Sequence, residues 1–404
     1  MVARMLEDIG RWMIVLSFCW LPTLSAARAA TYDSIFEPAM NSTTLSSGRD
    51  FTETRAQAWT FSPGNLLHVS TKKDDLSSSS LAAEPAADDC CDSDLCESDP
   101  CCRMCPRVYG WFESLLLWRN NQASSQPLVQ DLNANDQTLL GASDLRFGMA
   151  AGIRAGFGVR DCCGAGWEVN YFGLYGPVAT ANVVGSNNLR LPGDLGLIVN
   201  NFFGADVVDV RYASTLNNFE VNHVCCCCCC ECPTRCRSTE WLYGFRYLNL
   251  HEIFRISSTD FQESTSTYRV RTNNNLYGAQ VGARLRRCYG KWSWEGTGKA
   301  GIFGNAAQQA SDPITDFPNN FLVRDARSAS GGNVAFIGDL NLTGIYQINS
   351  TWGLRAGYNL IWIEGVALAP DQLDFTNTPT SGTTLANHGG VFLHGLNLGV
   401  EARW

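Results

Sequence analysis

Residues 391–404 alternate between apolar and polar side chains, and this alternation limits the local fold more than any other feature of the chain. One face carries Phe392, Leu396, Leu398, Val400, Ala402 and Trp404. The other face carries Gly395, Asn397, Gly399, Glu401 and Arg403. A period of two is typical of a β-strand with one apolar and one polar face, and it argues against a helix.

Alternating segments of this kind recur from Val108 onward. Segment 146–159 is the clearest, because its large apolar side chains alternate with glycine, alanine and arginine. About ten segments show the pattern, so we expect an all-β chain. They are 109–118, 146–159, 167–175, 219–222, 241–247, 277–285, 292–302, 334–346, 352–362 and 391–404.

A soluble β-sandwich also alternates, but three features favour a barrel in a membrane. The apolar faces are continuous, and no strand has the sequence of one buried on both faces. Long connections alternate with short ones, and tryptophans lie towards strand ends as in interfacial girdles. The long connections are 119–145, 176–205, 304–332 and 368–389, with 257–274 moderately long, and the short ones are 160–165, 286–290 and 347–351. The tryptophans are Trp111, Trp118, Trp167, Trp241, Trp292, Trp352, Trp362 and Trp404.

The predicted fold is an antiparallel transmembrane β-barrel of about 10–12 strands over residues 106–404. The count depends on residues 176–224, which have room for more than one strand. With both termini in the periplasm, ten strands place the long connections outside the cell and the short turns inside.

The N-terminus has the pattern of an export signal. Arg4 and Arg11 precede an apolar run from Trp12 to Leu24, and small residues follow up to residue 30. We therefore expect a signal peptide over 1–30, with an uncleaved anchor helix as the alternative. After it, no run of eighteen apolar residues indicates a spanning helix. Residues 31–105 are acidic and serine-rich, which predicts a disordered, low-complexity, Cys-rich periplasmic leader.

The C-terminal strand and several inner motifs carry a family resemblance. A last strand that ends on an aromatic residue resembles the sorting signal of bacterial outer-membrane barrels. Other segments resemble the putative beta-barrel porin-7 family over roughly residues 105–404. The matching segments are 352–362, Gly365 with 367–372, Tyr109-Gly110 with Glu113 and Leu115-Leu116, 244–248 and 275–280.

The resemblance implies a location in the bacterial outer membrane, among outer-membrane lipids, and a chain with no catalytic residues to transfer. It also implies that the barrel-assembly machinery recognises the last strand. The residues assigned to this assembly signal are Leu396, Leu398, Val400, Ala402 and Trp404.

Several charged residues share the parity opposite to the apolar faces, so we expect them to line the lumen. They are Arg154, Glu168, Arg246, Arg284, Glu295, Lys299, Asp339 and Arg355. Ion pairing among them is a simpler reading than acid–base catalysis. His251-Glu252 begins like a zinc-protease motif, but Arg255 stands where the second histidine belongs. We expect no enzyme activity, no cofactor and no metal.

The cysteines are unusually numerous. There are 18, and removal of Cys19 with the signal leaves 18 − 1 = 17, so at least one has no partner within the chain, unless it binds metal. Adjacent cysteines pair poorly, which favours disulfides between turns or chains, while Cys102–Cys105 and Cys229–Cys232 have zinc spacing. The cross-link candidates are Cys90, Cys91, Cys96, Cys101, Cys102, Cys105, Cys162, Cys163, Cys225, Cys226, Cys227, Cys228, Cys229, Cys230, Cys232, Cys236 and Cys288.

Two functions remain open at this stage. One is a porin-like, narrow channel for small solutes. The other is a structural or envelope-anchoring barrel with a filled lumen, cross-linked through periplasmic cysteines to cysteine-rich envelope proteins. Barrels of about eight strands are filled by side chains, whereas barrels of about sixteen strands leave a channel. A barrel of ten to twelve strands is nearer to the filled kind. The net charge of −9 argues against a nucleic-acid partner.

Overall fold

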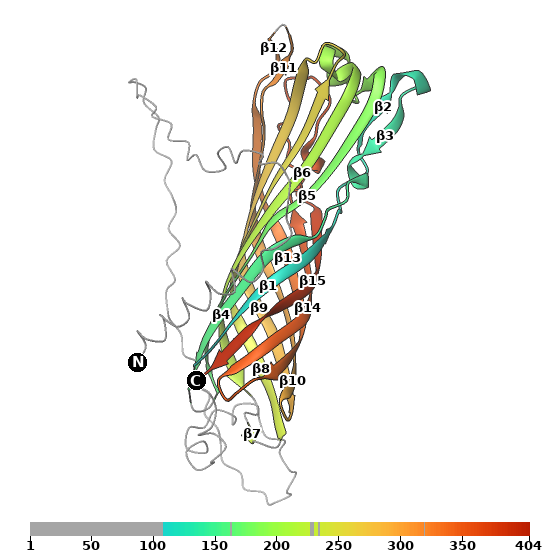
Figure 1. The fold of residues 1–404 in the computed structure, drawn as a ribbon. Helices are drawn as coiled ribbons and strands as arrows, with labels where there is room; N and C mark the ends of the chain where they lie inside the picture. Colours follow the sequence, from blue (N-terminus) through green and yellow to red (C-terminus); the bar gives the residue numbers. More distant parts are fainter. Residues whose placement is uncertain (1–107, 162–163, 227–229, 233–234, 319) are drawn as a thin grey trace, which may run out of the picture. The chain divides into compact units, whose positions relative to one another are not determined.

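The alternating segments form the strands of a closed antiparallel barrel (Figure 1). The computed structural model describes residues 108–404 except 162–163, 227–229, 233–234 and 319. The predicted signal peptide and leader, like most of the candidate cysteines, lie outside these described residues. Ten long strands build the wall: β1 (Val108–Asn120), β4 (Ala150–Arg160), β5 (Gly166–Arg190), β6 (Phe203–Cys226), β8 (Arg235–Thr259), β9 (Thr265–Tyr289), β10 (Trp292–Ser311), β13 (Arg327–Gln347), β14 (Trp352–Val366) and β15 (Gly389–Arg403).

Each wall strand pairs with its two neighbours in the chain, and β15 closes the barrel by pairing with β1. Trp404 N–H donates to the Val108 carbonyl at 2.8 Å, beside the last β1–β15 pairs. The prediction of an antiparallel barrel is therefore confirmed, with ten strands. We call the end that holds Val108 and Trp404 the terminal end, and the opposite end the distal end.

Shorter elements extend both ends of the wall. At the distal end, the β2–β3 hairpin adds to the edge of β5, and β11 pairs with β12. At the terminal end, β7 pairs with the start of β8. These strands are β2 (Pro127–Asp131), β3 (Gln137–Gly141), β7 (Cys230–Cys232), β11 (Ile314–Asp316) and β12 (Phe321–Arg324). The short helices are α3 (Leu195–Ile198), η3 (Leu132–Ala134), η4 (Ala142–Asp144), η5 (Asn200–Phe202) and η6 (Pro370–Gln372).

Three segments expected to be long connections are mostly strand. Of 257–274, only residues 260–264 connect β8 to β9, and 176–205 and 304–332 likewise extend β5, β6, β10 and β13. The expectation failed because the outward face of these extensions is polar, for example at Arg255, while the inward face stays apolar at Phe254. The region 176–224 adds no separate wall strand, because β5 and β6 simply continue.

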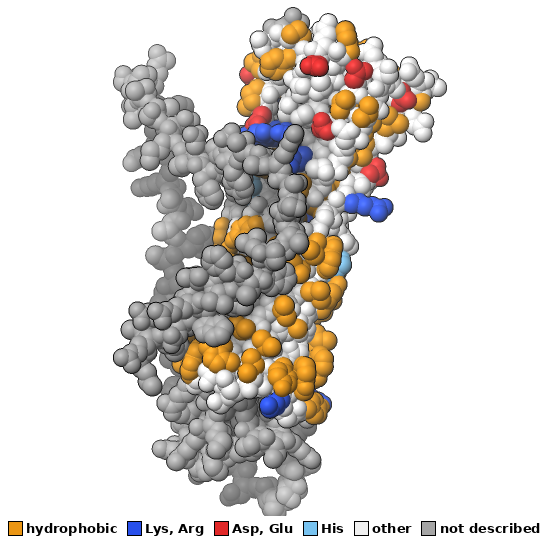
Figure 2. All heavy atoms as spheres, in the orientation of Figure 1, with side chains coloured by type: hydrophobic (Ala, Val, Ile, Leu, Met, Phe, Trp, Pro, Cys, Tyr) orange, Lys and Arg blue, Asp and Glu red, His pale blue; other side chains and the backbone are white. Residues whose placement is uncertain are grey.

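Large apolar side chains form a belt around the terminal half of the barrel (Figure 2). On β8, Trp241, Tyr243, Phe245 and Tyr247 all face outward and are exposed. A continuous outer apolar surface bordered by aromatic residues is typical of a barrel wall in contact with lipid. No helix in the described part of the chain is both long and apolar enough to cross a membrane.

Candidate functional site: the occluded lumen

The lumen of the terminal half is filled by a layer of paired charges. Seven acidic and seven basic side chains form it, all linked by ion pairs. The formal charges of these fourteen side chains cancel, and Arg403 adds a further cation next to Glu401, at 3.2 Å. The acids are Glu113, Glu168, Glu220, Glu240, Glu295, Asp339 and Glu401, and the bases are Arg154, Arg160, Arg246, Arg284, Arg286, Lys299 and Arg355.

Arg355 of β14 connects three strands across this layer. Its Nε lies 2.8 Å from Glu113 of β1, its Nη1 2.8 Å from Glu401 of β15, and its Nη2 3.0 Å from Glu295 of β10. The planar guanidinium suits several carboxylates at once, because its five N–H donors spread in one plane. The side chain is therefore held by three partners and is not available to a passing solute.

Two further arginines hold the layer in the same way. Arg284 binds both carboxylate oxygens of Glu168 at 2.8 Å, and it reaches Glu240 at 3.1 Å. Arg246 lies between Glu220 at 2.7 Å and Asp339 at 3.0 Å, and no part of its side chain is exposed. Buried charges require such partners, since an unpaired ion loses its hydration without compensation.

All eight residues assigned to the lumen from the sequence lie on the inner face and belong to this charged layer. The assignment missed Glu113, Arg160, Glu220, Glu240, Arg286 and Glu401. These residues could have been predicted from strand parity alone, because each occupies an inward position on a strand whose alternation is clear in the sequence. What the sequence lacked was the register between strands, which decides which acid meets which base.

Two small cavities lie within the charged layer. Their volumes are ≈ 40 and ≈ 50 Å³, and Trp111, Arg284, Glu295 and Arg355 border both of them. Spaces of this size accommodate a few water molecules beside polar groups. They are too small for a continuous water-filled passage.

An apolar layer lies next to the charged layer on its distal side. It takes side chains from all ten wall strands and from the connection after β14, and each is at most 3% exposed. A passing ion would lose its water here and gain no polar partner. The layer consists of Leu115, Leu117, Ala150, Phe172, Leu174, Leu216, Leu248, Leu250, Leu276, Phe303, Ala335, Ile337, Ile361, Ile363, Val366, Leu368, Val391 and Leu393.

The chain after β14 folds into the barrel and caps the apolar layer. Asn274 of β9 holds this segment: its Nδ2 donates to the Ala367 carbonyl at 2.9 Å, and Ala367 N–H donates to its Oδ1 at 2.7 Å. Asn305 of β10 donates to the Gly365 carbonyl at 2.9 Å. We call residues 366–373 the inserted segment.

A buried polar trio holds Ala369, two residues further along the inserted segment. Glu252 of β8 accepts from Ala369 N–H at 2.9 Å and from the Tyr212 hydroxyl at 2.8 Å. Arg119 of β1 forms an ion pair with the same carboxylate, and its guanidinium lies 4.5 Å from the centre of the Phe147 ring. Wall strands from both sides of the barrel thus hold one backbone position of the segment.

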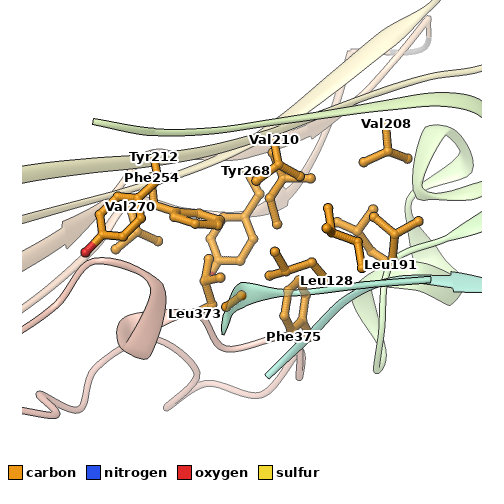
Figure 3. Packing of buried hydrophobic residues seen from close by; sticks show 14 of the residues in the cluster. Leu128, Leu191, Val208, Val210, Tyr212, Phe254, Tyr268, Val270, Leu373 and Phe375 are labelled. Carbon is orange, nitrogen blue, oxygen red and sulfur yellow. The ribbon is translucent and has the colours of Figure 1, made fainter. Parts of the chain in front are cut away.

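A second apolar core fills the distal half of the barrel (Figure 3). Leu373, the last residue of the inserted segment, and Phe375 point towards Tyr268 and Val210 of the wall. The Tyr268 hydroxyl also contacts the backbone of Asp374, accepting its N–H at 3.0 Å. The distal half is therefore closed by the chain's own connections.

Among the candidate cysteines, the structure describes Cys225, Cys226, Cys230, Cys232, Cys236 and Cys288 within strands. All six lie at the terminal end, where β6, β7, β8 and β9 begin or end. Their bonding stays a prediction. No group of three or more metal-binding side chains lies together in the described residues.

Comparisons with solved structures give low similarity. The outer membrane protease OmpT from Escherichia coli is 8% identical, with a TM-score of 0.45, 74% of this chain and 97% of that chain covered. The toluene transporter TbuX from Ralstonia pickettii is 6% identical, with a TM-score of 0.16 and coverage of 77% and 93%. An anion-selective porin from Comamonas acidovorans is 8% identical, with a TM-score of 0.13 and coverage of 74% and 98%. The comparison with curated proteins found no match.

A closed antiparallel barrel with an apolar outer belt and a charged lumen defines a porin-like barrel of the outer-membrane type. The family comparison makes the assignment specific. The model of the family "Putative beta barrel porin-7" matches residues 119–404, and the chain belongs to that family. The motif 367–372, one of the segments that carried the resemblance, is part of the inserted segment.

Proposed function

We propose that this protein is a structural barrel of the bacterial outer membrane whose lumen is closed and does not conduct. One observation carries the proposal: the apolar layer, capped by the inserted segment, interrupts the lumen between the charged layer and the distal end of the barrel. Transfer of a polar or charged solute through such a layer is unfavourable, because nothing in it replaces the lost water.

The charged layer supports the same function. Its seven acids and seven bases neutralise one another within the protein. A selective pore needs side chains that are free to bind a solute and release it. Here Arg246, Arg284 and Arg355 each hold two or more carboxylates. The layer therefore braces the barrel wall as a network.

The alternative is a narrow channel for small solutes, and the family's name favours it. This function requires an open state in which the inserted segment has left the lumen and the apolar layer has parted. Purified barrel in a planar bilayer tests both. We expect no single-channel steps above the baseline across ±150 mV (about the range bilayers tolerate). Stable conductance steps in the absence of denaturant would show that the protein is a channel.

An anchoring role through cysteines is a second part of the proposal. The candidate cysteines that are described lie at the terminal end, which faces the periplasm if the connections of the distal end face outward. Disulfides form in that compartment. Envelope analysed without reductant should contain high-mass species with this protein that collapse on reduction. If the protein runs as a monomer without reductant and metal analysis finds zinc bound to it, the cysteines bind metal and do not form cross-links.

A further inference from the structure

Four arginines lie together on the outer surface of three adjacent strands, above the apolar belt. In the register of the sheet, Arg211 of β6 is opposite Arg255 of β8, and Arg255 is opposite Arg269 of β9. Arg271 lies two residues from Arg269 on the same face. Directly opposed like charges destabilise a sheet. Such a row is expected where an anion outside the protein compensates the repulsion.

The acids nearby compensate the row only in part. Asp312 forms ion pairs with Arg269 and Arg271. Asp209, in the next row of β6, accepts a hydrogen bond from Asn182 at 2.7 Å. The local charge is therefore 4 − 2 = +2. Within the described residues, no ion pair is found for Arg211 or Arg255.

The cluster is confined to one part of the circumference. On β10, which pairs with β9, Ala310 is opposite Arg271, and the outward positions below it, Ala306 and Gln308, carry no charge. Asp312 follows directly after the end of β10. Figure 2 shows basic side chains at both borders of the apolar belt on the face drawn. The patch on β6, β8 and β9 differs from these single basic residues because Arg211, Arg255 and Arg269 are opposed in one row.

The first rows above the belt are polar, and only the row that contains Arg271 also holds the apolar side chains of Ala213 and Ile253. Phe219, Tyr247 and Tyr277 form the last aromatic row of the belt, and Asn217, Asn249 and Asn275 form the next row. Tyr247 donates to Asn275 at 2.8 Å, and Asn249 donates to Asn273 at 2.8 Å. Aromatic edges followed by amides provide donors and acceptors suited to the hydroxyl groups of sugars.

The height of the arginines selects the kind of lipid. Arg255 follows Tyr247 by eight positions, and a strand that rises about 3.3 Å per residue at a tilt of about 40° places it about 20 Å above that tyrosine. The polar headgroup region of a phospholipid bilayer is only about 5–8 Å thick on each side. A phospholipid phosphate is therefore too low to meet the row.

We propose that Arg211, Arg255, Arg269 and Arg271 bind the phosphorylated sugar head group of a glycolipid in the outer leaflet. The rows of asparagine contact its sugars, and the acyl chains lie on the apolar belt below. Arginine suits this partner because its planar fork binds phosphate oxygens in pairs. The proposal rests on the outer-membrane location of the proposed function but does not depend on whether the lumen conducts.

Binding isotherms of the folded barrel in detergent test the proposal. The probes are a phosphorylated rough-type lipopolysaccharide, the same glycolipid after removal of its phosphates, and phosphatidylglycerol. The variant Arg211→Gln with Arg255→Gln is compared with wild type and with Arg287→Gln, an exposed arginine near the terminal end of β9. Heat-shifted migration on gels shows that each variant is folded.

We expect the double variant to weaken binding of the phosphorylated glycolipid about tenfold or more, with Arg287→Gln unchanged. Dephosphorylation should weaken wild-type binding similarly. Equal affinity of wild type and double variant would overturn the proposal, as would equally tight, arginine-dependent binding of phosphatidylglycerol. A conducting barrel that keeps arginine-dependent affinity would overturn the proposed function and leave this inference standing.

Discussion

Asn274 binds both polar groups of the Ala367 backbone, its amide donating to the carbonyl at 2.9 Å and accepting from the N–H at 2.7 Å. The Asn274 side chain thus supplies the hydrogen-bond donor and acceptor that the backbone of a paired strand would supply to Ala367. The amide is fully buried. Because water cannot replace it, this residue, together with Asn305 and Glu252, fixes the position of the segment within the lumen.

Asn274→Ala should therefore loosen the inserted segment. It leaves a buried N–H and a buried carbonyl without partners, at a cost of about 2–4 kcal/mol in the free energy of unfolding. Urea unfolding followed by heat-shifted gel migration measures this cost, and limited proteolysis within 376–385 reports local release. Asn273→Ala, at an outward position, is the control. Equal stability of the two variants would contradict the role of Asn274.

Arg355→Met should destabilise the barrel by about 3–5 kcal/mol, because Glu113, Glu295 and Glu401 would keep their burial and lose their shared cation. The comparison variant is Arg287→Met, which removes an exposed arginine and should change stability by less than about 0.5 kcal/mol. Denaturant unfolding of both in the same detergent is the measurement. A cost for Arg355→Met as small as that of Arg287→Met would show that the three carboxylates find other partners.

Removal of Trp404 should impair assembly of the barrel. The residue ends the strand that closes the wall on β1, and its backbone exchanges hydrogen bonds with Val108 at 2.8 and 3.2 Å. Trp404→Phe keeps the backbone and an aromatic ring, so it should assemble normally. The yield of heat-modifiable protein in the outer-membrane fraction is the readout. Full assembly of the truncated chain would contradict an assembly signal in residues 396–404.

The connection after the inserted segment should loosen in acid through Asp374. Partial burial raises the pKa of this carboxyl, but hydrogen bonds from Thr376 and Gly382 and the charge of Arg324 outweigh it, so the pKa lies below its usual value. A lowered pKa in the folded state contributes stability above the unfolded value of about 3.9, and this contribution is lost as pH falls through the folded value.

Hydrogen exchange of segment 374–382 between pH 3 and 7 tests this prediction after correction for the intrinsic pH dependence of exchange. Protection should be constant from pH 7 to about 5 and should fall below about pH 4. Asp374→Asn should remove this dependence, because the amide does not titrate. A wild-type profile with the same shape as that of the variant would assign the change to another group.

Strand parity in the sequence determined the barrel class, the outward belt and the inward position of the charged residues. Such parity is legible because successive side chains of a strand point to opposite faces, and the belt must be apolar at every second position. The parity of Glu401 and Arg355, for example, follows from β14 and β15 alone. Their ion pair at 2.8 Å does not, because it requires the register between strands.

Only the tertiary structure decided that the lumen is closed. Leu248 and Leu276 occupy inward positions like those of Arg246 and Gln280, yet they meet other apolar side chains from across the barrel and form a continuous layer. The inserted segment was expected to be part of an outer connection, since its sequence has no strand alternation. Its place inside depends on Asn274 and Glu252, which are 93 and 117 residues away in the chain. Contacts between residues so far apart in the chain form only when the wall closes, and local sequence patterns do not predict them.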